Sequence, residues 1–453
     1  MNIVLSILCI FLLIISIFFS KAIEKQAISR WLLYLHFGVW LGSISLSVLN
    51  LYGLFEVSPK VYTIILVNVF AFFFGFVAIK TFNACDKNKI ICVIHNTVTS
   101  LHKNKAWAIF CLLFLLVNIY IVYKYANVLL LYTVNDVAKN RSLLFEDGSL
   151  ISSVNKYLLP AINYIIIFLL AYSVLFCRNW KYITLYFACA CCKSIVGGSR
   201  GSIMVIFIFL LVLLIINQYF AKDFLIKLNK SLKIGVIILT ISVYCIAGFL
   251  SFQRSRITVD EDKSFTLANL IDGCNELNKD IIVYTIGPFR ALDHAFSNHY
   301  PEKAEYPLLG RSTFMGLEGF ISMFSTQLGV PIKTVYDKTI ARQQADVFVI
   351  GYYNNQTILF NYAYTNAMIF YYDGGLLGVF IFSFLFGVFV KVIINLFLKR
   401  PNIYFAILVV FLFYCITRVI FQWTFINPAV YVFLAICLIG PVISNLRLHC
   451  HKK

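Results

Sequence analysis

Arginine is the residue type in this sequence that is best suited to chemistry on an anion. Its guanidinium stays charged and holds phosphate oxygens through two parallel hydrogen bonds. In a water-poor pocket, one donor aimed at a developing negative charge stabilises a transition state by roughly 3 kcal/mol. The distribution of basic residues predicts that eight arginines lie at a single membrane face: Arg141, Arg200, Arg254, Arg256, Arg290, Arg311, Arg342 and Arg418. We therefore expect a site for a phosphate-bearing substrate at that face.

Arg200 and Arg418 are the best placed of these arginines. Arg200 follows two glycines and a serine at the start of an apolar helix, where free backbone N–H groups and the helix dipole favour an anion. Arg418 lies late in an apolar run, near its outer boundary, where an ionisable residue is a functional candidate by default. The alternatives are structural: a snorkelling side chain at a helix start for Arg200, and snorkelling or a structural pair for Arg418.

Three more arginines are expected to bind the same anion. Arg254 and Arg256 directly follow an apolar run at headgroup depth, and non-specific contact with anionic lipid is their alternative role. Arg290 lies further along the same polar stretch. Secondary candidates at this face are Arg141, Lys193, Arg311 and Glu318.

Transfer to an acceptor hydroxyl also needs a general base. Asp293 and His294 follow Arg290 by three and four residues, so a helix would place all three on a shared face. An ordinary surface ion pair between Arg290 and Asp293 is the alternative. Asp373 is expected first as a helix N-cap and only secondly as a base or sugar ligand. For Glu318, too, a structural role is favoured over a role as base or ligand.

The sequence favours catalysis without a metal or other cofactor. Asp260-Glu261-Asp262 is the only acidic run of the long polar stretch, and a solvated cluster at a helix start explains it better than a metal site. No cluster of histidines and cysteines has the spacing of a zinc site. Arginines are therefore expected to replace a cation.

Most of the chain must form the membrane helices that position these residues. It has 453 residues, of which 61% are hydrophobic, and a mean hydropathy of +0.85, more apolar surface than one soluble core can bury. An all-α, polytopic membrane protein with about eleven transmembrane helices is therefore expected. The apolar runs lie at about 2–20, 31–55, 61–82, 106–131, 157–177, 180–197, 202–221, 233–251, 374–397, 402–420 and 425–445.

The net charge of +18 indicates orientation in the membrane and not nucleic-acid binding. Basic residues concentrate in alternate short loops, which predicts that these loops are cytoplasmic. Lys391, Lys399 and Arg400 are counted in this set. The N-terminus then lies outside, the C-terminus inside, and the polar stretch faces out.

Three regions follow from this pattern: N-terminal helices in 1–250, a large outer loop in 251–373, and C-terminal helices in 374–453. Within the loop, apolar residues at helical spacing from Phe314 to Leu328 predict an amphipathic helix that lies on the membrane or caps a cavity. Val347–Ile350 and 358–360 flank a turn signal and predict a hairpin.

Several motifs occur in order over the second half of the chain. They are Gly197-Gly-Ser-Arg-Gly201, Tyr284-x-x-Gly287-Pro288-Phe289-x-Ala291, Gly310-x-x-Thr313-Phe314, Asn361-x-x-Tyr364-Thr365 and Tyr372-Asp373-Gly374-Gly375-x-x-Gly378. Together they resemble the Wzy-type O-antigen polymerases, which join the repeat units of bacterial surface polysaccharides. The Arg-x10-Gly pairs described in some polymerases of this class are absent at every outer arginine, so no arginine role is carried over.

The resemblance implies a GT-C-like membrane glycosyltransferase of lipopolysaccharide biosynthesis, in the bacterial inner membrane with its site at the periplasmic face. The growing glycan would pass from undecaprenyl diphosphate to the non-reducing end of an incoming lipid-linked unit. A chain-length regulator is an expected partner, and nucleic acid is not. An O-antigen ligase and a polysaccharide flippase or transporter remain the alternatives.

Overall fold

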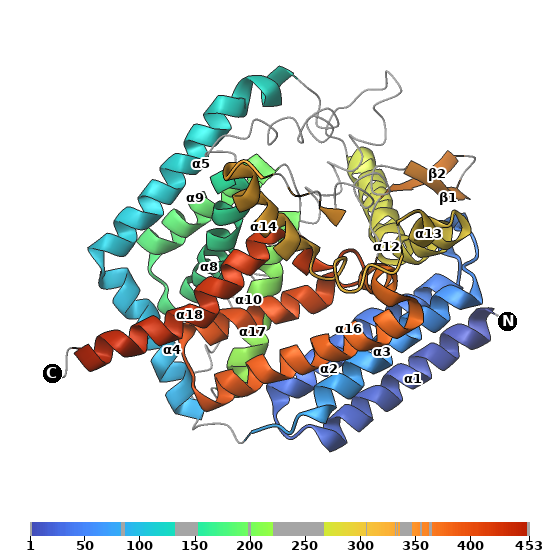
Figure 1. Ribbon diagram of the computed structural model, residues 1–453, viewed down its shortest axis with the longest axis horizontal. Coiled ribbons are helices and arrows are strands. Elements are labelled where there is room, and N and C mark those ends of the chain that lie inside the picture. The colour runs from blue at the N-terminus through green and yellow to red at the C-terminus, as the bar shows by residue number, and fades with distance from the viewer. Residues whose placement is uncertain are drawn as a thin grey trace.

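The structure is a computed structural model. It describes residues 2–82, 87–131, 153–197, 201–220, 267–304, 306–330, 332, 334–335, 347–353, 356–361 and 365–450. The described chain is mostly helical, as the composition predicts (Figure 1).

The described chain contains several long apolar helices, as expected of a polytopic membrane protein. Within the described residues, six helices are long and apolar enough to cross a membrane: Ile3–Ile23, Ala27–Val48, Pro59–Ala78, Lys105–Tyr123, Val154–Cys177 and Asn366–Lys399. Shorter apolar helices cover Val205–Ile216, Ile403–Arg418 and Pro428–Pro441. The predicted run 180–197 forms a helix that is not among the six, and the run 233–251 lies outside the described residues.

The helices of the N-terminal part run in the order α1 to α10. Their bounds are α1 Asn2–Ile23, α2 Ala27–Val48, α3 Pro59–Ala78, α4 Lys87–Lys103, α5 Lys105–Leu131, α8 Leu159–Tyr172, α9 Trp180–Gly197 and α10 Gly201–Phe220. Single π-helical turns at Val154–Leu158 and Ser173–Cys177 flank α8.

The second half of the chain contains both membrane helices and elements of the long loop. These are α12 Leu267–Ser297, α13 Tyr300–Lys303, α14 Met315–Gln327, β1 Val347–Tyr353, β2 Gln356–Asn361, α16 Asn366–Lys399, α17 Ile403–Arg418 and α18 Pro428–Cys450. A 3-10 turn, η6 Thr424–Ile426, joins α17 to α18.

Glycines allow α3 and α16 to pack closely against each other. A Cβ at Gly75 would lie 1.9 Å from the Phe384 carbonyl oxygen, and one at Gly387 would lie 2.1 Å from the Phe72 carbonyl oxygen. Small residues at such contacts let membrane helices approach backbone to backbone, which strengthens van der Waals packing where no hydrophobic effect drives association. The close contact joins α16, in the second half of the chain, to α3 in the first half.

The long helix α16 is broken near its start. Its backbone leaves helical geometry at Gly374 and Gly375, and Gly375 has a φ of +62°, which favours glycine. A Cβ at Gly375 would also lie 2.5 Å from the Tyr306 hydroxyl oxygen. The predicted span 374–397 therefore begins earlier, at Asn366, with a short first segment that precedes the break.

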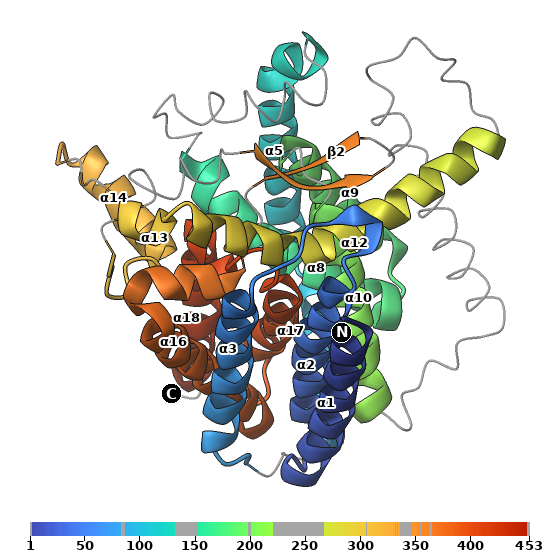
Figure 2. The ribbon, with the colours of Figure 1, turned by 90° about the vertical axis from the view of Figure 1, so that its right-hand side faces the viewer.

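The described elements between α12 and β2 form a layer across one end of the membrane helices. Figure 2 shows α12 running crosswise over the adjacent ends of α2 and α3, with β2 above it. The amphipathic helix predicted over 314–328 is confirmed as α14, and the predicted hairpin is confirmed as the antiparallel pair of β1 and β2. We call this end of the molecule the α12 end.

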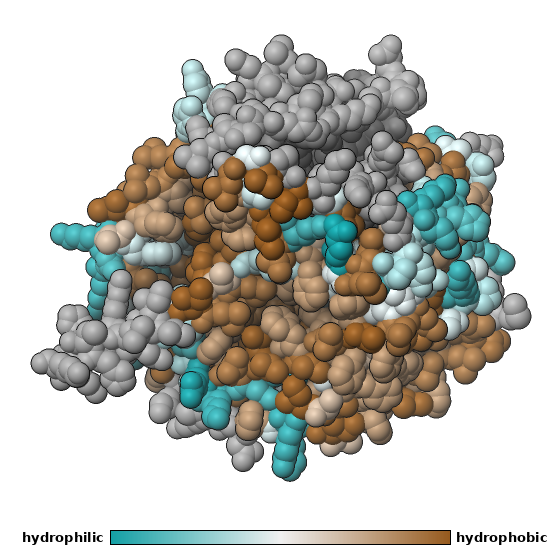
Figure 3. Space-filling model, in the orientation of Figure 1, coloured by the Kyte–Doolittle hydropathy of each residue, from teal (hydrophilic) through white to brown (hydrophobic). Residues whose placement is uncertain are grey.

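Hydrophobic side chains cover much of the surface that the membrane helices present. In Figure 3 brown predominates across the middle and the lower right of the view. On α1, Ile7, Phe11 and Phe18 are more than half exposed, and on α5 Leu113 and Leu116 are as well. A chain in water would bury such a surface, so lipid is its expected surrounding.

The end opposite α12 contains a buried ion pair. Lys391 Nζ lies 2.5 Å from Glu24 Oε1 and 2.5 Å from Thr81 Oγ1, and Thr81 donates to Glu24 Oε2 at 2.7 Å. Lys391 is fully buried within α16. The charge count above is therefore wrong for Lys391, because this lysine is a packed helix residue and not part of a loop.

Candidate anion site

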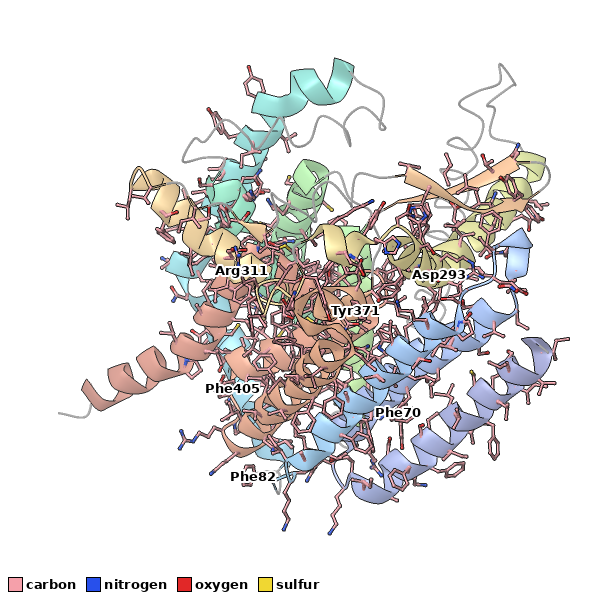
Figure 4. The ribbon with its side chains drawn as sticks, turned by 45° about the vertical axis from the view of Figure 1, so that its right-hand side comes forward. Phe70, Phe82, Asp293, Arg311, Tyr371 and Phe405 are labelled. Atoms are coloured by element: carbon pink, nitrogen blue, oxygen red, sulfur yellow. The ribbon has the colours of Figure 1, made fainter. Side chains whose placement is uncertain are left out.

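Arg290 and Asp293 lie one turn apart on α12, as predicted, but they bind two different helices and not each other. Arg290 donates to the Ser47 carbonyl oxygen and Oγ, each at 3.1 Å, and to Asn50 Oδ1 at 2.8 Å. Asp293 accepts from the Ser58 N–H at 3.2 Å and from its hydroxyl at 2.5 Å. The cation thus lies at the C-terminal end of α2 and the anion at the N-terminal end of α3, as each helix dipole favours. Figure 4 labels Asp293 at this junction.

Arg290 is closed to a ligand in this conformation. Its side chain is 4% exposed, and its remaining terminal N–H donates to the Ile286 carbonyl oxygen at 3.1 Å. Burial lowers the pKa of Arg290 to about 10, so the guanidinium stays protonated at neutral pH. Arg290 and Asp293 together fasten α12 across the membrane helices beneath it.

His294 supports the hairpin. Its ring stacks on Phe348 of β1 with 4.1 Å between centroids and an interplanar angle of 4°. The amide nitrogen of Asn298, one turn later, lies 3.3 Å from the ring nitrogens. The His294 side chain is half-buried in the α12 layer.

Asp373, within α16, binds the backbone of a turn that precedes α14. Its carboxylate accepts the Ser312 N–H at 2.9 Å, the Thr313 N–H at 2.8 Å and the Thr313 hydroxyl at 2.5 Å. The carbonyl oxygen of Asp373 accepts the Leu309 N–H at 3.1 Å. The expected N-cap chemistry is present, but it serves the segment 308–314 and not the start of α16. We call this segment the 308–314 turn.

The hydrogen-bond partners of Arg418 among the described residues are neutral. It ends α17, and its guanidinium donates to the Tyr414 hydroxyl at 2.7 Å and to Gln422 Oε1 at 3.0 Å. Of the carboxylates that the structure describes, none lies within 4 Å of it. The side chain is half-buried. Both partners are neutral, so they orient the guanidinium while leaving its charge available to an anion.

The segment after Arg418 is tied to both the 308–314 turn and the start of α16. Trp423 Nε1 donates to the Thr313 carbonyl oxygen at 2.9 Å, and the Asn366 N–H donates to the Val419 carbonyl oxygen at 2.9 Å. The structure therefore brings Arg418 and Asp373, which are far apart in sequence, into one connected region.

Two hydroxyl groups of this region have no hydrogen-bond partner among the described residues. They are Ser312 Oγ in the 308–314 turn and Thr365 Oγ1 before α16, and both are buried. Buried polar atoms are normally satisfied, so such atoms mark a place for water or a ligand. We call Arg418, the 308–314 turn and Thr365 the turn region.

Two secondary candidates pair with each other. Arg311 Nη2 forms a salt bridge with Glu318 Oε1, and Glu318 Oε2 accepts the Val335 N–H at 2.9 Å. The Arg311 side chain is 51% exposed. Lys193 instead lies buried in α9 and donates to the carbonyl oxygen and Oδ1 of Asn155.

Several predicted ligands lie outside the described residues. They are Arg141, Arg200, Arg254, Arg256 and Arg342, together with the acidic run Asp260-Glu261-Asp262. Within the described part of the chain, no group of three or more His, Cys, Asp or Glu side chains could hold a metal ion.

Sequence reasoning missed a polar cluster inside the membrane helices. Asn68 of α3 and Asn366 of α16 exchange side-chain hydrogen bonds at 3.3 Å, and Ser383 donates to Asn68 Oδ1 at 2.6 Å. All three residues are buried. A polar residue within an apolar run was the available signal for Asn68, as it was for Lys391. The cluster joins both segments of the broken α16 to α3.

We compared the chain with protein-family models, curated proteins and solved structures, and none of them matches it.

Proposed function

We propose that this chain is a membrane glycosyltransferase that polymerises oligosaccharide repeat units carried on undecaprenyl diphosphate. The observation that carries the proposal is Arg418, a half-buried guanidinium with neutral partners at the end of an apolar helix. A lipid diphosphate brings negative charge to this depth of the bilayer. The buried, unpartnered hydroxyls of Ser312 and Thr365 add hydrogen-bonding groups in the same region.

The reaction places its main demand on stabilising a leaving group. The bond between the anomeric carbon of the growing glycan and a diphosphate oxygen breaks, and the lipid diphosphate leaves with the electron pair. The acceptor hydroxyl oxygen forms the new glycosidic bond and passes its proton to a base. Arg418 is assigned to the diphosphate, with Arg200, Arg254 and Arg256 as further proposed ligands, because arginine holds such charge through paired hydrogen bonds.

His294 and Asp293 are the proposed bases. Both side chains are half-buried, whereas the Asp373 carboxylate is buried and accepts three hydrogen bonds from Ser312 and Thr313. Asp373 is therefore assigned to positioning the 308–314 turn. His294→Ala and Asp293→Asn, assayed with purified protein over a pH range, separate the two bases. Only loss of the true base should remove the acidic limb of the pH profile.

The proposal assigns charge neutralisation to arginine and needs no metal. Purified protein should keep full turnover in excess chelator. Loss of turnover that Mg²⁺ restores would contradict this assignment.

Transport of the same lipid-linked substrate is the second candidate function. The broken helix α16 and the buried pair of Lys391 and Glu24 favour it, because transporters place discontinuous helices and ionisable residues inside the membrane. A polymerase, a transporter and a ligase can be compared by the surface glycan that remains after the gene is deleted.

Deletion of the gene in its host separates these functions. If the chain is the polymerase, the surface glycan of the deletion strain carries a single repeat unit when run on a gel. If it is a flippase or a ligase, no repeat unit reaches the surface lipid. Complementation with Arg418→Ala should reproduce the polymerase defect, and Arg400→Ala, an exposed arginine at the opposite end of the molecule, should restore the full ladder.

The proposal also places the α12 end at the periplasmic face of the bacterial inner membrane. A reporter that is active only in the periplasm, fused at Ser264, should be active. Activity of a cytoplasmic reporter at that position would overturn the orientation.

A further inference from the structure

Five apolar residues in and directly beside α14 face away from the protein. Phe314, Leu317, Ile321, Phe324 and Leu328 recur at helical spacing, and their exposed fractions are 49%, 38%, 50%, 49% and 81%. We call these five residues the α14 stripe. A helix of a water-soluble domain turns such a face toward the core. An exposed stripe of this kind therefore needs an apolar covering that the described chain does not provide.

The other side of α14 is fastened to the protein. A Cβ at Gly316 would lie 2.4 Å from the Phe425 carbonyl oxygen, and one at Gly319 would lie 3.2 Å from Pro428 Cγ. Met315 is buried, and Glu318 accepts the Val335 N–H. The orientation of α14 is thus set by close packing on η6 and the start of α18, and rotation cannot hide the stripe.

The stripe continues onto a membrane-facing surface. The ring of Phe314 lies 6.2 Å from that of Phe382, edge to face. Phe382 belongs to α16, a helix long and apolar enough to span a membrane, whose exposed residues include Leu377 and Phe380. Figure 2 shows α14 at the edge of the molecule, near the level of α12 and above α16. The same lipid that covers α16 would reach the stripe.

We propose that α14 is an interfacial helix whose stripe inserts into the acyl region of the bilayer leaflet at the α12 end. A helix lying at this depth buries its apolar face among acyl chains and keeps its polar side toward protein or water. The occupant is bilayer phospholipid, because the stripe is continuous with the lipid-facing surface of α16. This inference does not depend on the reaction that the chain performs.

Insertion of the stripe would fix the depth of the turn region in the bilayer. The 308–314 turn leads directly into α14 and is held by Asp373 and Trp423. With α14 anchored in the leaflet, the turn and Arg418 lie at the depth of phospholipid headgroups. An amphiphilic substrate could then be received without leaving the membrane.

Photocrosslinking of the full-length protein tests the inference. Benzoylphenylalanine replaces Ile321 or Phe324, and the protein is reconstituted in vesicles of phosphatidylethanolamine and phosphatidylglycerol. After irradiation, mass spectrometry should find adducts to phospholipid acyl chains at both positions. The matched control replaces Tyr352 of β1, which is 56% exposed on the hairpin and should give severalfold less lipid adduct.

A second variant keeps the test decisive. Ile321→Glu, placed in the protein that carries the probe at Phe324, adds a charge to the stripe and should reduce the lipid adduct severalfold. Tyr352→Glu in the same protein should leave the adduct unchanged. Equal adduct yields at 324 and 352, or crosslinks from 324 to another protein in native membranes, would overturn the proposal.

Discussion

Lys391 and Arg418 are both cations among apolar helices, at opposite ends of the molecule. They differ in burial and in whether a described carboxylate neutralises the charge. Lys391 is fully buried and bound to the Glu24 carboxylate. Arg418 is half-buried and bound to a phenol and an amide, which are neutral. A charge whose compensation lies within the protein holds helices together. A charge that the protein orients without neutralising it can accept an external anion.

The largest effect is expected from breaking the compensated pair. Glu24→Ala leaves Lys391 buried without a counter-charge, and such changes destabilise a protein by about 3–5 kcal/mol. The apparent unfolding temperature in detergent should fall strongly. The double variant Glu24→Leu/Lys391→Met removes both charges and should recover most of the loss. A double variant no more stable than the single one would contradict the assignment.

The next effect concerns activity and not stability. Arg418→Ala should lower turnover about a hundredfold, because one donor aimed at a developing charge contributes roughly 3 kcal/mol. The unfolding temperature should change little, since no carboxylate loses its partner. Arg418→Lys should retain part of the activity because it keeps the charge without the paired geometry. If the unfolding temperature of Arg418→Ala fell as strongly as that of Glu24→Ala, Arg418 would be a structural cation like Lys391.

Arg290 provides an intermediate case. Among the described residues it forms no salt bridge, yet Ser47, Asn50 and the Ile286 carbonyl oxygen accept from its terminal nitrogens, while its buried Nε has no partner there. Arg290→Met should cost about 2 kcal/mol of stability, because hydrogen bonds to a charged group contribute roughly 1.5–3 kcal/mol. Asp293→Asn should cost less, since asparagine still accepts from Ser58. Thermal unfolding of both variants measures this order, and the reverse order would argue against the two-ended fastening of α12.

The smallest effect is expected at an exposed compensated pair. Arg311 and Glu318 form a salt bridge with the arginine half exposed to solvent. Pairs of this kind contribute about 0–1 kcal/mol. Arg311→Ala should therefore leave the unfolding temperature nearly unchanged. A loss as large as that of Glu24→Ala would show that burial is not what separates the strong pairs from the weak ones.

The sequence alone determined the class of the molecule and several local elements. Composition and apolar runs predict a polytopic helical membrane protein, because a chain with this much apolar surface requires lipid. The stripe from Phe314 to Leu328 predicts α14, and the flanked turn predicts the hairpin of β1 and β2. These patterns depend on residues close in sequence, so periodicity is sufficient to show them.

Tertiary structure decided the partners of the charged residues. The spacing of Arg290 and Asp293 correctly placed them on one helix, but only the packing of α12 across α2 and α3 directs each to its own helix end. The same limit applies to Lys391, which appears as a loop charge in sequence and lies beside Glu24 in the fold. The role of a charged side chain depends on groups that are near in space but distant in sequence. The order of residues along the chain does not show which groups these are.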